Sequence, residues 1–327
     1  MNSRQRLLDT LSFRRGCPPP RFEAEFSDEL VKMWTQQGHL RGESPEEFLG
    51  LDSRETLPVE WGKLHDGTRV VMDEDDLAPF RRAYDPSDRR RLSVDWPELV
   101  AVFQDHTSIL WDSPWDEGFF QVLGIRDAES FSQALTMACE KPCLAEAQME
   151  HYATFLETLI DEVFSKIAID YAVFYEPIAS NSAPVISPAM YAHFVQSALR
   201  RIVDRLARYG VRHFFIWTAG QVRPLVPVWL EAGINGFMIT QAGAAGISYR
   251  ALRREFGASI RFFGGIDWRT VMDGPRAVES FLDSEARPLL EQGGYVPHLD
   301  DRVREYVSFE AYCAYRTRLD ALIAEGH

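Results

Sequence analysis

Cysteine is scarce in this chain. Its 327 residues include four cysteines, Cys17, Cys139, Cys143 and Cys313, which excludes a small secreted domain held together by disulfides. Cys139 and Cys143 form a C-x3-C pair, but no second pair completes a set of metal ligands. We interpret the pair as small buried residues rather than as half of a metal or redox site.

Long apolar segments are also missing. No run approaches the 18 apolar residues that a membrane-spanning helix requires. The opening sequence MNSRQRLLDTLSFRRG contains no apolar segment typical of a signal peptide. We therefore expect a cytoplasmic protein with reduced thiols and no membrane partner.

Basic residues are in the minority. Acidic residues number 49 and basic residues 35, which gives a formal net charge of -14. Such a chain does not attract nucleic acid or an anionic membrane surface. A small anionic molecule is not excluded, because a few arginines can reverse the field within one pocket. The expected partner is a small-molecule substrate.

The last third of the sequence shows a regular order of elements. From Gly210 onward, apolar strand runs alternate with Gly-turns and helices, which predicts a parallel sheet and, in closed form, a (β/α)8 barrel. No linker divides the chain, so we expect one domain over residues 1–327. Residues 45–125 have the weakest periodicity and are rich in proline, and we expect them to form a loop-rich insertion at the rim of the barrel.

Polar and aromatic side chains follow the expected strands. In a parallel barrel the carboxyl ends of the strands carry the chemistry. The candidate site residues at these ends are Glu176, Trp217, Gln221, Gln241, Asp267, Trp268, Arg269, His298, Asp300 and Asp301.

Several segments resemble the uroporphyrinogen decarboxylase superfamily. They are the stretch from Asp170 to Tyr191 with its ISP, then RPLVPVWLEAGINGF, FFGGIDWRTVMDGP, and PLLEQGGYVPHLDDRV followed by VSFEAYCAY. The opening NSRQRLLDTL and the spacing of Trp34 and Gly38 are similar to the same group. The resemblance covers residues 160–320 best and implies a distorted (β/α)8 barrel. The superfamily includes cofactor-free porphyrinogen decarboxylases and metal-dependent methyltransferases that work with corrinoid proteins.

The sequence departs from both branches of this superfamily. Where methyltransferases carry zinc ligands at a strand end, this chain has Trp217, Ala219 and Met238, which supply none. Where porphyrinogen decarboxylases carry an arginine-rich loop, this chain has CPPPRFEAEF, with Arg21 as its one arginine. We therefore expect no metal, no cofactor and a substrate other than uroporphyrinogen.

The candidate residues divide into two groups. Glu176, His298, Asp300 and Asp301 are the candidates for proton transfer, since a carboxyl with a raised pKa can donate a proton near neutrality. Asp300 and Asp301 are adjacent and, if extended, face opposite sides, so we expect one of them at most in the pocket. The candidates for substrate binding are Trp217, Gln221, Gln241, Asp267, Trp268 and Arg269. For Asp267 and Arg269 we favour a structural ion pair over substrate binding, whereas Glu176 is equally well explained as a buried structural carboxylate.

Three functions remain open from the sequence. The first is an enzyme, a metal-independent lyase or decarboxylase that acts on a small organic acid by acid/base chemistry. The second is a methyltransferase with a corrinoid protein as partner, for which zinc would require an unusual ligand set such as Glu176, His298 and Asp301. The third is a non-catalytic relative that binds a ligand beside Trp217 and Trp268. A homodimer is compatible with each.

Overall fold

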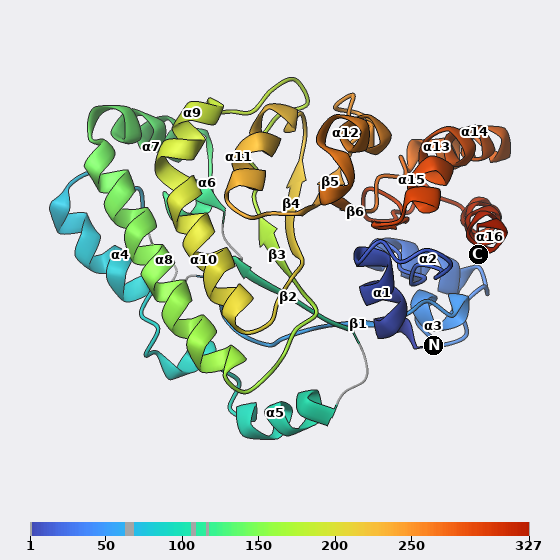
Figure 1. Cartoon of the computed structure of the whole chain (residues 1–327), viewed down its shortest axis with the longest axis horizontal. Coiled ribbons are helices and arrows are strands. Elements are labelled where there is room, and N and C mark those ends of the chain that lie inside the picture. The colour runs from blue at the N-terminus through green and yellow to red at the C-terminus, as the bar shows by residue number, and fades with distance from the viewer. Residues whose placement is uncertain (1, 63–68, 106–108, 116–117, 327) are drawn as a thin grey trace.

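The computed structural model describes residues 2–62, 69–105, 109–115 and 118–326. Within them, seven strands form a single sheet in sequential order, and every neighbouring pair is parallel (Figure 1). The predicted parallel sheet is confirmed. The strands are β1 (Arg54–Thr56), β2 (Ile109–Trp115), β3 (Tyr171–Tyr175), β4 (Phe214–Ala219), β5 (Gly236–Thr240), β6 (Arg261–Phe263) and β7 (Tyr295–Val296).

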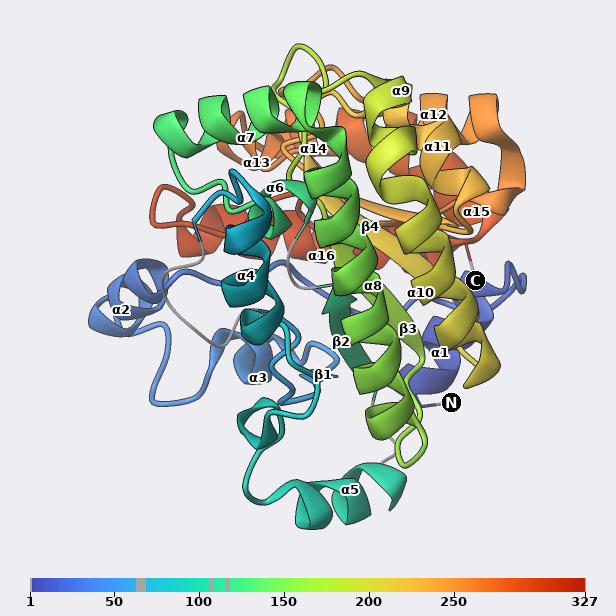
Figure 2. The ribbon, with the colours of Figure 1, turned by 90° about the vertical axis from the view of Figure 1, so that its left-hand side faces the viewer.

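Helices surround this sheet. They are α1 (Ser3–Leu11), α2 (Asp28–Gln36), α3 (Pro45–Leu49), α4 (Leu77–Ala83), α5 (Trp96–Asp105), α6 (Phe119–Val122), α7 (Ala128–Glu140), α8 (Pro142–Phe164), α9 (Pro188–Tyr191), α10 (Ser197–Arg208), α11 (Val226–Glu231), α12 (Tyr249–Phe256), α13 (Arg269–Met272), α14 (Pro275–Phe281), α15 (Arg287–Gln292) and α16 (Phe309–Glu325). Helices α8 and α10 lie side by side over the outer face of the sheet (Figure 2).

Local signals set several of these boundaries. The Ser27 hydroxyl caps α2 by accepting a hydrogen bond from the Leu30 amide. Pro142 divides the helical stretch 127–168 into α7 and α8, as predicted, because proline fits the first turn of a helix but not its interior. The break leaves Cys139 in α7 and Cys143 in α8, and both are exposed rather than buried.

The strands bury both faces, as parallel strands do. On β3 and β4, Phe174 and Ile216 point into the outer core beneath the helices, whereas Tyr171, Val173 and Phe215 point to the opposite face. This alternation follows from the two-residue period of a strand. The inner face forms a second, smaller core that also contains Phe263, Val296 and three residues from the N-terminal segment, Leu7, Leu11 and Phe22.

The sheet curls strongly around this inner core. Strands lie about 4.8 Å apart, so side chains on β3 and β6 of a flat sheet would be separated by roughly 14 Å. The rings of Tyr171 on β3 and Phe263 on β6 have centroids only 5.4 Å apart, and Phe215 on β4 lies 4.6 Å from Phe263. The inner face is therefore concave, and Leu7 and Leu11 of α1 close one end of it.

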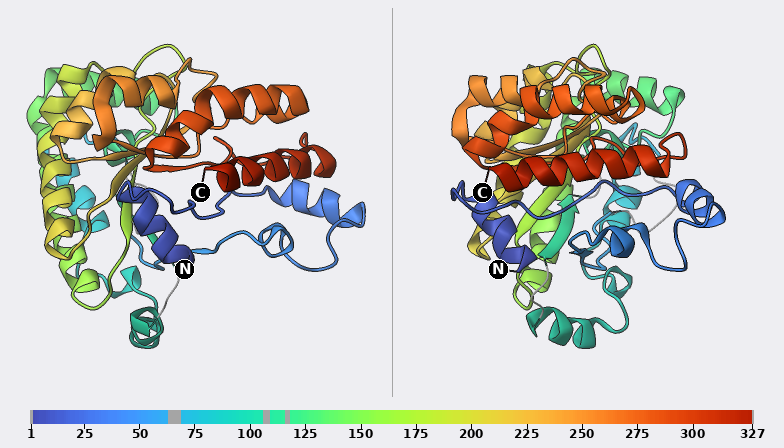
Figure 3. Two further views of the ribbon diagram at one scale, coloured as in Figure 1. Left: turned by 45° about the vertical axis from the view of Figure 1, so that its right-hand side comes forward. Right: turned by 90° about the vertical axis from the view of Figure 1, so that its right-hand side faces the viewer.

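The sheet has seven strands in the described part of the chain, rather than the eight that were expected. Beyond β7, parallel pairing continues only as single bridges, between Ile266 and Leu299 and between Phe26 and Val303. The N-terminal segment that contains Phe26 runs beside the chain that follows β7 and beside α16 (Figure 3). The Tyr312 ring of α16 lies 5.4 Å from that of Phe26.

Residues 45–125 contribute to the sheet itself. They contain β1 and part of the helical layer, and β2 joins β1 to β3. β1 has only three residues, and Pro114 lies within β2, where the pairing with β3 shifts register. The sequence pattern of these two strands is correspondingly weak. The one-domain arrangement of the chain stays a prediction.

Candidate active site

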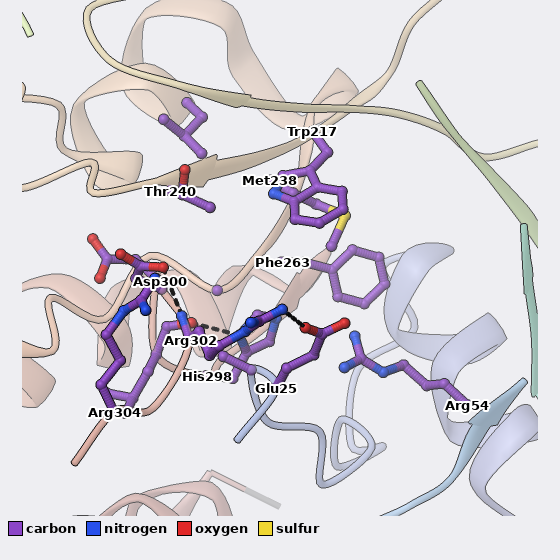
Figure 4. A pocket seen from close by; sticks show the side chains of 15 residues that line it. Glu25, Arg54, Trp217, Met238, Thr240, Phe263, His298, Asp300, Arg302 and Arg304 are labelled. Atoms are coloured by element: carbon purple, nitrogen blue, oxygen red, sulfur yellow. Dashed lines mark hydrogen bonds and ion pairs between the residues drawn. The ribbon is translucent and has the colours of Figure 1, made fainter. Parts of the chain in front are cut away.

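A cavity of about 350 Å³ opens on the concave side of the sheet (Figure 4). One wall is apolar and comes from three neighbouring strands: Trp217 on β4, Met238 on β5 and Phe263 on β6. The facing side is polar and comes from the segment that follows β7. Its lining residues are His298, Leu299, Asp300, Asp301, Arg302 and Arg304, with Ala24, Glu25, Arg54, Ile239, Thr240 and Gly264 completing the cavity.

His298 is buried at this wall, and its ring is neutral. Burial and the nearby charge of Arg54 lower the pKa of His298 to about 3. Its Nδ1 lies 2.7 Å from the carbonyl oxygen of Leu299, which can only accept, so Nδ1 carries the proton. The Nε2 lone pair has no hydrogen-bond partner within the described part of the chain. His298 therefore presents a free acceptor nitrogen.

Asp300 is the second buried polar group of the cavity. Its Oδ1 accepts a hydrogen bond from the Trp268 amide at 3.3 Å, and the Gly243 amide lies near enough to favour the carboxylate, whereas Oδ2 makes no hydrogen bond of normal geometry among the residues described. Burial, followed by the charge of Asp267, raises the pKa of Asp300 to about 7. The carboxyl is thus present in both protonation states near neutral pH, as a general acid or base requires.

Asp301 also lines the cavity, although we expected only one of the two aspartates there. Residues 300 and 301 lie in a bend rather than in an extended strand, so the strict alternation of sides does not apply. The Oδ2 atom of Asp301 accepts a hydrogen bond from Gln241 Nε2 at 3.0 Å. Gln241 has a left-handed backbone (φ 53°), and its backbone N–H donates to the Asp300 carbonyl. From the end of β5, Gln241 therefore holds both aspartates in place.

Asp267, Trp268 and Arg269 lie beside this cavity rather than in it. They line a separate open hollow together with Tyr306, whose ring lies 4.5 Å from that of Trp268. The Arg269 Nε donates to both Asp267 carboxylate oxygens, at 2.9 Å and 3.0 Å, and Nη2 donates to Oδ2 at 2.5 Å. The structural ion pair is present. The negative charge of Asp267 also affects the cavity, because it raises the pKa of Asp300.

Glu176 and Gln221 are not among the residues that line the cavity. The buried carboxyl of Glu176 accepts hydrogen bonds from the Phe119 amide at 3.0 Å and the Tyr191 hydroxyl at 2.9 Å. Burial raises its pKa to about 7. Gln221 donates to the Ala245 carbonyl at 2.9 Å. Glu176 thus ties β3 to α6 and α9.

Several cavity residues were missed by sequence reasoning. Arg54 lies on the three-residue strand β1, which has no recognisable period. Glu25 and Arg302 form an ion pair of 2.5 Å at the mouth, across 277 positions of sequence, and no local signal pairs them. Met238 was noted only as a residue that replaces a zinc ligand, and Phe263 only as part of the FFGGIDWR segment. Their inward direction follows from the register of β5 and β6.

Metal ligation finds little support in this geometry. In the portion of the chain that the structure describes, no three His, Cys, Asp or Glu side chains are grouped so that they could hold a metal ion. Of the three residues considered as zinc ligands, His298 and Asp301 line the cavity. The third, Glu176, lies outside it, where β3 contacts α6 and α9. The metal content stays a prediction.

Among the described helices, none has the length and apolar character needed to cross a membrane.

Comparison with known proteins identifies the fold. No protein-family model matches the chain, and no curated protein matches it in sequence. A methyltransferase from Methanosarcina mazei shares its architecture with a TM-score of 0.64 and 16% identity, over 99% of this chain and 99% of that one. The TTHB071 protein from Thermus thermophilus, soaked with ZnCl2, aligns over 94% of this chain and 100% of that one at 16% identity, but its TM-score of 0.39 carries no argument. At 16% identity, the first likeness establishes a related α/β fold.

Proposed function

We propose that this chain is a lyase of the decarboxylase type that acts on a small organic acid by proton transfer from Asp300. The observation that carries the proposal is the pair of buried, unpartnered polar atoms at the cavity, Asp300 Oδ2 and His298 Nε2. Other buried side-chain atoms, such as Thr10 Oγ1 and Trp34 Nε1, also lack a partner in the described residues, but Asp300 and His298 line a cavity that a ligand can enter. A bound substrate would supply those partners.

The protonation states fit this chemistry. Asp300, with a pKa of about 7, carries its proton for part of the time at neutral pH, and neutral His298 can accept a hydrogen bond at Nε2. When a carbon–carboxylate bond breaks, CO2 leaves and the electron pair stays on the substrate carbon, delocalised into an unsaturated group of the substrate. The Asp300 proton then forms the new C–H bond, and the ionised Asp300 recovers a proton from water.

Cavity size agrees with a small substrate. A volume of about 350 Å³ lies at the lower end of the range for small-molecule sites. We propose that the chain is a divergent, distorted (β/α)8 barrel of the uroporphyrinogen decarboxylase superfamily that acts on something smaller than a tetrapyrrole. The concave parallel sheet and the full-length likeness in fold support this placement.

Deuterium incorporation tests the proposal without knowledge of the natural substrate. Candidate unsaturated acids are incubated with the protein in D2O, and NMR follows new C–D bonds and loss of the carboxyl carbon. Asp300→Asn should lower the rate by about 10²–10⁴-fold, the usual contribution of a general acid. Asp301→Asn, one position away and partly exposed, is the matched control and should lose far less. An Asp300→Asn variant that keeps the wild-type rate would refute the assignment.

A methyltransferase is the second candidate. It is favoured by one observation, the fold shared over 99% of both chains with the Methanosarcina mazei methyltransferase. In this case a corrinoid protein would be the partner. Metal analysis of untagged protein purified without chelator separates the two candidates: we expect no stoichiometric zinc, and one zinc per chain would move the methyltransferase ahead of the lyase.

A further inference from the structure

Arg54 stands out among the charged residues that line the cavity. It is half-buried and reaches from β1 toward the space beside Phe263, Glu25 and His298 (Figure 4). Its Nη2 donates to the carbonyl oxygen of Glu23 at 2.8 Å. Across the described residues, no carboxylate forms an ion pair with it.

Several other shielded arginines have a carboxylate partner. Arg6 pairs with Asp52, Arg201 with Glu157, and Arg316 with Asp320. Among the described residues, Arg91 and Arg253 have no carboxylate partner either, but they are buried and donate to backbone carbonyls. Arg54 differs from them in that it lines a cavity. The Tyr171 hydroxyl lies near enough to accept from the Arg54 side chain as well, and the donors that remain are available to a ligand oxygen.

The Arg54 side chain is also held in place. Its Cζ lies 5.0 Å from the centre of the Phe22 ring, which is fully buried and stacks on Phe263 at 6.2 Å. Stacking of guanidinium on an aromatic ring, together with the bond to the Glu23 carbonyl, restricts the rotamers of the side chain. Little conformational entropy is then lost when a ligand binds.

The other two arginines of the cavity differ from Arg54. Arg302 is engaged by Glu25 at 2.5 Å, and both side chains are largely exposed at the mouth. Arg304 is exposed as well. Exposed charges are screened by water and salt, so they bind an anion less selectively than a shielded guanidinium does.

The wall near Arg54 is apolar. Trp217, Met238 and Phe263 offer a flat, sulfur- and ring-lined surface of the kind that packs on an aromatic or unsaturated body. A carboxylate held by arginine is stabilised as an anion and does not leave readily. If decarboxylation occurs in this cavity, the carboxyl that departs must be a different one.

We propose that Arg54 anchors a retained carboxylate, and that the substrate is an aromatic or unsaturated acid with two carboxyl groups. One carboxylate of the substrate binds the Arg54 guanidinium, and the aromatic or unsaturated part of the substrate packs on Trp217, Met238 and Phe263. The second carboxyl is lost near Asp300. The departing carboxyl is carried by a carbon next to the unsaturated group and outside any aromatic ring, so the electron pair left by CO2 passes into that group until the Asp300 proton forms the C–H bond. This substrate class rests on the proposed function, whereas the anchoring role of Arg54 can be tested apart from it.

Binding of benzoate, which has the ring and the retained carboxylate alone, tests the anchor. Titration calorimetry near pH 7 compares benzoate, isophthalate, benzamide and succinate. We expect benzoate and isophthalate to bind, and benzamide and succinate to bind at least about tenfold more weakly, because each lacks one of the two features that the cavity recognises. Benzamide binding as tightly as benzoate, or no binding of benzoate at millimolar concentration, would overturn the proposal.

Substitution of Arg54 assigns the effect to one residue. Arg54→Gln should weaken benzoate binding by roughly tenfold or more. Arg54→Lys keeps the charge but not the planar guanidinium, so its dissociation constant for benzoate should lie between those of the wild type and Arg54→Gln. Arg276→Gln, an exposed arginine on α14, is the control and should bind as the wild type does. Melting temperatures show whether each variant folds. If Arg54→Gln does not fold, the Arg54→Lys value and the benzamide comparison decide.

The anchor and the proton-transfer role fail in different ways. Benzoate binding that is unchanged in a folded Arg54→Gln variant, or weakened equally in Arg304→Gln, would refute the anchor alone. If Asp300→Asn keeps benzoate binding and also keeps the wild-type rate of deuterium incorporation from a diacid that the wild type decarboxylates, the proposed function fails while the anchor stands.

Discussion

The carboxylate of Glu23 accepts a hydrogen bond from the backbone amide of Leu299 at 2.9 Å and so joins two segments 276 positions apart. Leu299 lies between His298 and Asp300, so this bond fixes the backbone that carries both cavity groups. The other carboxylate oxygen accepts from the Tyr312 hydroxyl at 2.9 Å, and Arg316 lies 3.9 Å away. The N-terminal segment, the chain after β7 and helix α16 therefore meet at one buried acid.

Glu23→Ala should destabilise the protein strongly. It leaves the Leu299 amide and the Tyr312 hydroxyl without partners and removes the acid facing buried Arg316, which together should cost about 3 kcal/mol or more. Glu23→Gln keeps one acceptor oxygen and should lose less. Urea unfolding measures both. Glu25→Ala, two residues along and exposed at the mouth, should cost no more than about 1 kcal/mol; equal losses at the two positions would contradict this account.

Glu176→Gln should change the pH dependence of stability. The pKa of Glu176 is raised to about 7 by burial, above its ordinary 4.5, so the folded state favours the protonated acid. Its contribution to stability is full below about pH 4.5 and is lost as the pH rises through about 7, a difference of roughly 3 kcal/mol. Glutamine resembles the neutral acid, so the variant should match the wild type near pH 5 and exceed it near pH 8 in urea unfolding.

Turnover by the same variant should stay within a few-fold of the wild type, because Glu176 does not line the cavity. A large loss of rate with the fold retained would restore Glu176 to the catalytic role that the sequence suggested. Parallel stability profiles of the two proteins would show that its carboxyl is not the titrating group.

Gly264→Ala should disturb His298. Gly264 has a left-handed backbone (φ +77°), and an added Cβ would lie 3.0 Å from His298 Cε1. Gly246 also has a positive φ (+68°), with nothing within 4 Å of the added atom, so Gly246→Ala measures the backbone strain alone. We expect about 1 kcal/mol for Gly246→Ala and a larger loss for Gly264→Ala, by urea unfolding. Equal losses would mean that the ring moves aside without cost.

Trp217→Ala should weaken benzoate binding more than Trp268→Ala does. Trp217 lines the cavity, whereas Trp268 lies against Tyr306 in the neighbouring hollow. Loss of a ring that covers the ligand costs about 1 kcal/mol or more, which is roughly fivefold in the dissociation constant. A larger effect at Trp268 would place the ligand in the open hollow instead.

The sequence by itself determined the local structure and the class of fold. Strand–helix alternation after Gly210 predicts the parallel sheet, Ser27 predicts the start of α2, and Pro142 predicts the break between α7 and α8. These features depend on residues within a few positions of one another, so a linear pattern contains them. The same pattern selects His298, Asp300 and Asp301 as polar residues that follow a strand.

Only the tertiary structure decided which of these residues share a cavity. The curl of the sheet turns Trp217, Met238 and Phe263 inward, and the short strand β1 brings Arg54 beside them. Glu176 follows its strand in the same way as Asp300 follows β7, yet it is bound by α6 and α9 instead. Protonation near neutral pH is likewise a property of burial, which contacts between distant parts of the chain create.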